Sequence, residues 1–249
     1  MYLDLCLLSC DLNPDYYEFF PLIKRCWKRN VGIDCILILV ADEIPYSLMS
    51  EKDSIILFPP IKNIPTAFQA QCIRLLYPGL LNFNGIIISD MDIIPLNNDF
   101  FTKPIQKLSQ DTFCVYRDVI SEYKQYPMCY CAASSETWKN VFHCIIMNDV
   151  IQTLILWYTK DDYCISSATS HMWAQDQLQL YKFLSLTKSP VVKFTDEQTK
   201  FYRLDRSDLS YIVNNLTDVK NQILQGHYSD FHLPRPYDKY AEFLAEILP

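Results

Sequence analysis

Two aspartates separated by one residue follow an apolar run in the segment GIIISDMDIIPL, residues 85–96. If the segment is extended, Asp90 and Asp92 point to the same side, because alternate side chains of a strand share a face. Two such carboxylates supply hard oxygen ligands, which suit Mg²⁺ or Mn²⁺ and leave coordination positions open for phosphate oxygens. A surface loop with two solvated acids is the alternative. The apolar residues on both sides favour a strand end, where buried carboxylates need a cation or hydrogen bonds.

The elements that must position these carboxylates alternate along the first hundred residues. Four apolar runs predict buried strands, at residues 2–9, 34–41, 54–58 and 85–89. Two segments between them predict helices, at residues 13–30 and 64–81. This order is typical of an α/β fold with a mostly parallel central sheet flanked by helices. Ligands bind such sheets at the carboxyl ends of the strands, which is where Asp90 and Asp92 lie.

The second half of the chain is less regular. Three short strands are predicted there, at residues 112–119, 126–134 and 190–194. Three helices are also predicted, at residues 135–147, 173–186 and 235–249. No repeat, low-complexity tract or linker interrupts the sequence. A chain of 249 residues without such a break is expected to form a single domain.

Composition excludes several classes of function. The net charge of −7 argues against nucleic-acid binding, because no basic surplus is available to neutralise phosphates. Four glycines leave no Gly-rich phosphate-binding loop. The first residues lack the pattern of a signal peptide, and the apolar runs are too short for a transmembrane segment, so we expect a cytoplasmic location. The ten cysteines are scattered without a Cys-x-x-Cys pair, which favours reduced, buried thiols.

Residues 67–101, AFQAQCIRLLYPGLLNFNGIIISDMDIIPLNNDFF, resemble a segment of the GT-A-fold glycosyltransferases, in which a helix that carries an arginine leads into the Asp-x-Asp strand. The arginine is Arg74, sixteen residues before Asp90, a spacing similar to that in glycosyltransferase family 8. Three later segments resemble further motifs of these enzymes in the same order: CYCAASSETWKNVF at residues 129–142, WAQDQ at 173–177 and GHYSDFHLPRPY at 226–237. Compact bacterial and large-virus sugar transferases are the most similar members.

The resemblance implies a metal-dependent hexosyl- or pentosyltransferase. It would move a sugar from a nucleotide-sugar donor, expected to be a UDP-sugar, to a glycan or other hydroxyl acceptor. Mn²⁺ or Mg²⁺ would neutralise the charge that builds on the diphosphate as the sugar leaves. Asp92 would bind the metal, Asp90 the metal or the donor ribose, and a C-terminal histidine would be the third ligand. His232 is preferred to His227 because the following LPRP restricts its backbone.

The resemblance also divides the GT-A-like domain, residues 1–249, into two halves. Residues 1–101 would bind the nucleotide, and residues 102–249 the donor sugar and acceptor, with a C-terminal segment that closes the site. At the end of the first strand, the candidate nucleoside contacts are Ser9 and Asp11 for polar bonds and Tyr16 or Tyr17 for stacking. Asp11 is equally interpreted as a helix cap. Arg74 would pair with phosphate or with Asp90.

Asp176, in the WAQDQ segment, is the candidate catalytic carboxylate. In an inverting enzyme it would be the general base that takes the proton of the acceptor hydroxyl, whereas in a retaining enzyme a residue in this region would contact the donor sugar. The alternative is an exposed acid in the first turn of a helix, where the helix dipole stabilises it.

Two other functions stay open. One is a catalytically silent module that binds a nucleotide-sugar. The other is a metal-dependent phosphatase that uses the Asp-x-Asp pair, although Ile94 stands where the haloacid-dehalogenase-like motif has Thr or Val.

Overall fold

Nearly continuous apolar segments form the middle of the central sheet, because a strand that is covered on both faces has no polar side. β1 (Leu5–Asp11) pairs in parallel with β2 (Asp34–Val40) on one side and with β4 (Ile86–Ser89) on the other. β2 pairs in parallel with β3 (Ile55–Phe58). The computed structural model describes residues 1–160 and 174–248.

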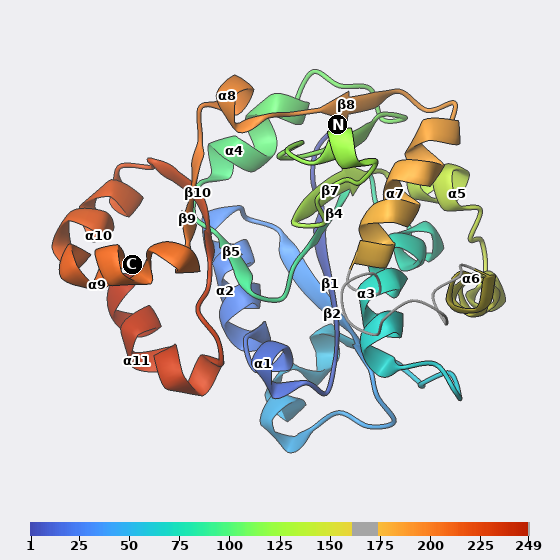
Figure 1. The fold of residues 1–249 in the computed structure, drawn as a ribbon, viewed down its shortest axis with the longest axis horizontal. Helices are drawn as coiled ribbons and strands as arrows, with labels where there is room; N and C mark the ends of the chain where they lie inside the picture. Colours follow the sequence, from blue (N-terminus) through green and yellow to red (C-terminus); the bar gives the residue numbers. More distant parts are fainter. Residues whose placement is uncertain (161–173, 249) are drawn as a thin grey trace.

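Three further strands extend this sheet beyond β4. β7 (Tyr130–Ala133) is antiparallel to β4, β6 (Phe113–Val115) is antiparallel to β7, and β8 (Val191–Lys193) is parallel to β6. In the described part of the chain the sheet order is therefore β3-β2-β1-β4-β7-β6-β8 (Figure 1). The predicted α/β fold with a mostly parallel central sheet is confirmed.

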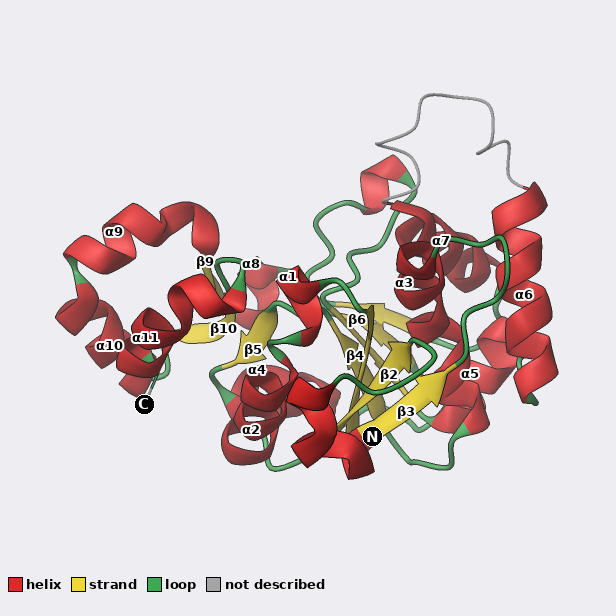
Figure 2. Ribbon diagram, turned by 90° about the horizontal axis from the view of Figure 1, so that it is seen from below, coloured by secondary structure: helices red, strands yellow, loops and turns green. Residues whose placement is uncertain are grey.

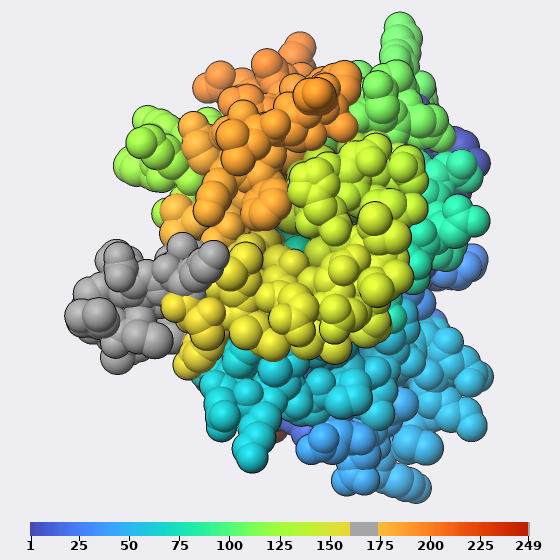
Figure 3. Space-filling model, turned by 90° about the vertical axis from the view of Figure 1, so that its right-hand side faces the viewer, coloured from blue at the N-terminus to red at the C-terminus, as the bar shows by residue number. Residues whose placement is uncertain are grey.

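Helices cover both faces of the sheet (Figures 1 and 2). One face carries α2 (Phe20–Asn30) and α4 (Asn98–Thr102), whose buried side chains join one apolar core. A second apolar core lies under four helices: α3 (Thr66–Leu76), α5 (Ser135–Phe142), α6 (Met147–Lys160) and α7 (Gln175–Leu186). Figure 3 shows this side of the molecule, with the yellow-green, yellow and orange segments of α5, α6 and α7 toward the viewer. Among the described helices none is long and apolar enough alone to span a bilayer, and only α5 with α6, across a 45° bend, reaches that length and composition.

A small second sheet lies beside the central one (Figure 2). β10 (Tyr228–His232) is its middle strand, antiparallel to β5 (Ile93–Pro95) and parallel to β9 (Tyr202–Asp205). Four helices precede or follow β9 and β10: α8 (Asp196–Thr199), α9 (Leu209–Asn214), α10 (Leu216–Leu224) and α11 (Tyr237–Ile247). The short helix α1 (Pro14–Tyr17) follows β1 of the central sheet. β5 begins directly after Asp92, so this sheet brings the C-terminal segment to the Asp-x-Asp pair.

A buried ion-pair network joins the small sheet to the central one. Asp230 of β10 accepts from Arg117 Nη2 at 2.6 Å and from Arg203 Nε at 2.7 Å, and Arg117 also contacts Asp196. Burial alone would raise the pKa of Asp230, but Arg203 and Arg117 outweigh burial and hold this pKa below its usual value. The carboxylate therefore stays ionised in the interior between two cations.

Several predicted elements have different limits in the structure. The predicted helix 13–30 is divided into α1 and α2, because Pro21 lies in the first turn of α2 and has no N–H to continue a helix. The predicted helix 135–147 ends at Phe142, since His143 adopts a left-handed conformation with φ of 57°. Trp173, the first residue of the predicted helix 173–186, and Pro249, the last of 235–249, lie outside the described residues.

Candidate active site

Arg74, in the last turn of α3, lies between two carboxylates at the carboxyl end of β4. Its Nη1 donates to Asp90 Oδ1 at 2.5 Å and to the Ser89 carbonyl at 3.3 Å, and its Nη2 donates to Asp176 Oδ2 at 2.8 Å. The structure thus brings together three residues that the sequence singled out from separate segments. Of the two predicted partners of Arg74, phosphate and Asp90, the ligand-free chain forms the pair with Asp90.

Asp176 is held on all sides at the start of α7. Its Oδ1 accepts from Gln71 Nε2 at 3.1 Å and from the Gln177 backbone N–H at 2.8 Å, while Oδ2 accepts from Arg74. The residue is 1% exposed, so its interpretation as an exposed surface acid is wrong. Burial raises the pKa of Asp176 to about 6, against the lowering effect of Arg74. At neutral pH it is therefore ionised, desolvated and fixed in orientation.

Asp92 lies against His232 of the C-terminal segment, while their roles as metal ligands stay predictions. The β5–β10 pairing places His232 opposite Ile93, and His232 Nε2 lies 3.3 Å from Asp92 Oδ2. The other ring nitrogen, Nδ1, lies 2.9 Å from Asp205 Oδ2. His227, the alternative histidine, is exposed just before β10.

Two arginines also approach Asp92 Oδ2. Arg206 Nη1 donates to it at 2.8 Å, and Arg235 Nε lies 3.5 Å away. Burial would raise the pKa of Asp92, but His232 and the two arginines outweigh burial and lower it. Arg235 belongs to the C-terminal segment that the sequence singled out, whereas no motif or periodic pattern pointed to Arg206.

These residues fit a divalent ion only in part. The 3.3 Å between Asp92 Oδ2 and His232 Nε2 suits neighbouring ligands of one ion, which lie roughly 3 Å apart when each is about 2.1 Å from Mg²⁺. Asp205 holds the far side of the ring, as carboxylates behind metal-binding histidines do. Within residues 1–160 and 174–248 no group of three or more His, Cys, Asp or Glu side chains is arranged to hold a metal. Asp92 and His232 would thus need phosphate and water to complete the coordination, and a metal-binding role for Asp90 stays a prediction.

The candidate nucleoside contacts lie at the end of β1. Ser9 Oγ donates to the Ala70 carbonyl at 2.5 Å and so joins β1 to α3. Asp11 accepts from Thr66 Oγ1 at 2.8 Å and from the Asn13 N–H at 3.2 Å. The helix cap is Asn13 and not Asp11, because the Asn13 side chain accepts the Asp15 N–H. Contacts of Ser9 and Asp11 with a nucleoside stay predictions.

Tyr16 of α1 lies next to the group around Asp92. Its ring is 4.7 Å from Arg235 Cζ, and its hydroxyl accepts from Arg235 Nη1. Tyr17, on the same short helix, is half-buried like Tyr16. Tyr16 is therefore the tyrosine that the structure connects to the predicted metal ligands.

No model of a known protein family matches the sequence, and no curated protein matches it. Solved structures do match in fold. The galactosyltransferase LgtC, solved with donor and acceptor sugar analogs, has a TM-score of 0.51 and 12% identity, and the match covers 98% of this chain and 96% of LgtC.

Two larger proteins also match in fold. The glycosyltransferase GlyE of Streptococcus pneumoniae TIGR4 has a TM-score of 0.50 and 12% identity, and the bifunctional glycosyltransferase WbbM has 0.50 and 9%. The match covers 94% and 99% of this chain, but the chain spans only 55% of GlyE and 50% of WbbM. The chain therefore has the GT-A fold of glycosyltransferases, as the resemblance of its sequence implied.

Proposed function

We propose that this protein is a metal-dependent glycosyltransferase that transfers a sugar from a nucleotide-sugar, with a UDP-sugar as the expected donor, to a hydroxyl group of a glycan or similar acceptor. One observation carries the proposal. On a GT-A fold, Arg74 joins Asp90 to Asp176 at the carboxyl end of β4, and Asp92 meets His232 only two residues further along the chain. Titratable groups gathered at that edge of an α/β sheet are typical of a ligand site.

Each residue has a role in this proposal. Asp92 and His232 would hold the divalent ion, and Asp205 would keep the imidazole oriented with Nε2 toward it. When bound, the ion would stabilise the negative charge of the leaving diphosphate. Arg74 holds Asp90 and Asp176 in place, and Asp90, whose side chain is 30% exposed, would accept hydrogen bonds from donor hydroxyl groups.

The geometry of Asp176 bears on its chemical role. A general base must reach the acceptor hydroxyl, whereas both oxygens of Asp176 already accept hydrogen bonds and the residue is 1% exposed. This arrangement argues against proton abstraction by Asp176 and supports a positioning role, in which Asp176 holds Arg74 and, through it, Asp90. The same observation favours a second candidate function, a catalytically silent module that binds a nucleotide-sugar.

The decisive experiment is binding followed by turnover. Nucleotide-sugars of uridine, guanosine, cytidine and thymidine are tested by thermal shift with Mn²⁺ and with a chelator, and release of the nucleotide is then measured. We expect stabilisation by a UDP-sugar with Mn²⁺, and slow release of UDP. Binding without any release would favour the silent module, and no binding of any nucleotide-sugar would refute both.

A matched pair of variants locates the site. Asp92→Asn should remove the Mn²⁺-dependent stabilisation, because a neutral amide is a poor ligand for a hard cation. The control is Asp53→Asn. Asp53 is exposed and precedes β3, so it lies at the amino ends of the parallel strands, away from the site, and this variant should behave as the unchanged protein.

A further inference from the structure

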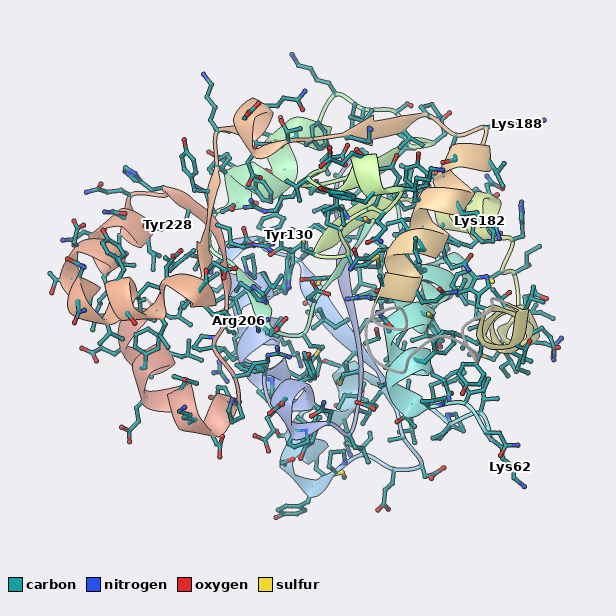
Figure 4. The ribbon with its side chains drawn as sticks, in the orientation of Figure 1. Lys62, Tyr130, Lys182, Lys188, Arg206 and Tyr228 are labelled. Carbon is teal, nitrogen blue, oxygen red and sulfur yellow. The ribbon has the colours of Figure 1, made fainter. Side chains whose placement is uncertain are left out.

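Arg206 occupies the carboxylate that is expected to bind the metal. Its Nη1 lies 2.8 Å from Asp92 Oδ2, and its other hydrogen bond in the described residues, to the Leu233 carbonyl, is long at 3.4 Å. The Arg206 side chain is 30% exposed and the Asp92 side chain 8%. Figure 4 places Arg206 where the three-stranded sheet meets the rest of the domain.

A divalent ion held jointly by Asp92 Oδ2 and His232 Nε2 would compete with Arg206 for that oxygen. Arg206 and Arg235 together bring two positive charges to Asp92, which equals the charge of the ion. An ion about 2.1 Å from that oxygen would lie within a few ångströms of the guanidinium groups, where like charges repel strongly. Binding of the ion between Asp92 Oδ2 and His232 Nε2 therefore requires an arginine to move.

Arg206 is the arginine that can leave more easily. Arg235 is anchored a second time, because it stacks on the Tyr16 ring and donates to the Tyr16 hydroxyl. Among the residues that the structure describes, the second hydrogen bond of Arg206 is the long one to the Leu233 carbonyl. A guanidinium that leaves a carboxylate pairs equally well with a phosphate, since its N–H groups match both in geometry.

We propose that Arg206 is a diphosphate-binding residue, which neutralises Asp92 in the ligand-free protein and moves to the donor diphosphate when a divalent ion takes its place. The inference rests on the proposed function, because it needs a diphosphate and a metal at this site. The consequence is that metal and diphosphate bind cooperatively. The diphosphate draws Arg206 away from Asp92, and the metal occupies the carboxylate that Arg206 leaves. Each ligand must then strengthen the other by the same factor.

The experiment measures the two ligands separately and together. Binding of Mn²⁺ alone and with UDP is followed from the electron paramagnetic resonance signal of the free ion, and binding of UDP is followed by calorimetry with Mn²⁺ and with a chelator. In Arg206→Gln, Mn²⁺ alone should bind about two- to fivefold more tightly, the range for losing a partly exposed ion pair. UDP with Mn²⁺ should bind about tenfold more weakly, since a hydrogen bond between charged groups is lost. A purely structural residue would not shift the two affinities in opposite directions.

Three further variants serve as controls. Lys188→Gln makes the same change in charge at an exposed residue far from Arg206 (Figure 4) and should change neither affinity. Arg206→Lys keeps the charge but loses the planar guanidinium, so it should leave Mn²⁺ binding unchanged and weaken UDP binding. Adding Asp92→Asn to Arg206→Gln should abolish the gain in Mn²⁺ affinity. Thermal unfolding of each variant shows whether it is folded.

The outcomes separate this inference from the proposed function. If the unchanged protein binds UDP with Mn²⁺ but Arg206→Gln alters neither affinity, or weakens both, the inference is overturned while the function stands. If UDP binds as tightly with the chelator as with Mn²⁺, the arginines neutralise the diphosphate without a metal, and the inference is also overturned. If neither UDP nor any nucleotide-sugar binds, the proposed function fails and the inference fails with it.

Discussion

Replacing Arg74 with methionine tests the ion-pair arrangement at the centre of the site. Methionine keeps an apolar stem of similar length but removes the cation that joins Asp90 to Asp176. Arg74 is 8% exposed and Asp176 is 1% exposed, so water does not replace the lost partner of Asp176. Removing one member of a buried ion pair costs about 3–5 kcal/mol, because the other charge stays buried. We expect the free energy of unfolding to fall by about this amount in mildly alkaline solution.

The loss should depend on pH in a defined direction. In the unchanged protein the pKa of Asp176 is about 6, above its value of about 3.9 in the unfolded chain. The stability contributed by the protonated carboxyl is therefore present below about pH 4 and lost as the pH rises to about 6. Without Arg74 the pKa of Asp176 rises further, so this loss continues above pH 6. The difference between the two proteins should thus shrink on acidification, by at most about 1.4 kcal/mol per pH unit.

Urea denaturation of both proteins at about pH 5.5 and about pH 8 measures this difference. The double variant Arg74→Met/Asp176→Asn is the control, because it leaves no buried charge at Asp176. It should recover most of the stability and lose the added pH dependence. A loss that is equal at both pH values would refute Asp176 as the unpaired charge. A loss below about 1 kcal/mol would show that the pair behaves as an exposed one.

Three further changes have expected outcomes. Asp205→Asn should weaken Mn²⁺-dependent UDP binding by about 10- to 100-fold, because His232 loses the partner behind its ring, and unaltered binding in calorimetry would contradict this role. Asp230→Asn leaves two arginines without their buried partner and should lower the free energy of unfolding in urea by about 3–5 kcal/mol, so a change near zero would remove the network from the forces that join the two sheets. Gly85→Ala should destabilise the protein by at least about 2 kcal/mol, because the added Cβ would lie 1.9 Å from the Tyr2 carbonyl oxygen. Gly32→Ala is the control and should cost about 1 kcal/mol, because Gly32 has a φ of +88° but no atom within 4 Å of the added Cβ. Similar melting temperatures for the two variants would contradict the packing argument.

The sequence predicted those parts of the site that depend on local pattern. Continuous apolar runs predicted the central strands, because a buried strand has an apolar sequence. Asp90 and Asp92 follow one of these runs, so their place at the carboxyl end of β4 could be predicted from their order in the sequence. The resemblance then added Arg74, Asp176 and His232. In the structure Arg74 pairs with Asp176, and His232 lies next to Asp92.

Other features depend on contacts between distant segments and left no local signal. Arg206 is one of many polar residues in an irregular stretch, and only the folded chain places it on Asp92. Ser9 is a plausible nucleoside contact from its place after an apolar strand, but its hydroxyl is already bonded to a carbonyl of α3. The small sheet was not predicted because strands of three to five residues are stabilised mainly by their partners.

The small sheet nevertheless decides the distance between the two expected metal ligands. In β10, Asp230 and His232 share one face, because they are two residues apart. Phe231 between them and Leu233 directly after the strand alternate with them and are fully buried in the apolar core. A slip of one residue against β5 would turn His232 away from Asp92 and expose both apolar side chains, so burial of these side chains opposes the slip. The bond from the Leu233 N–H to the Asp92 carbonyl, at 2.7 Å, fixes the same register from the backbone. Two apolar residues that carry no ligand atom thus position a histidine against a carboxylate far away in the sequence.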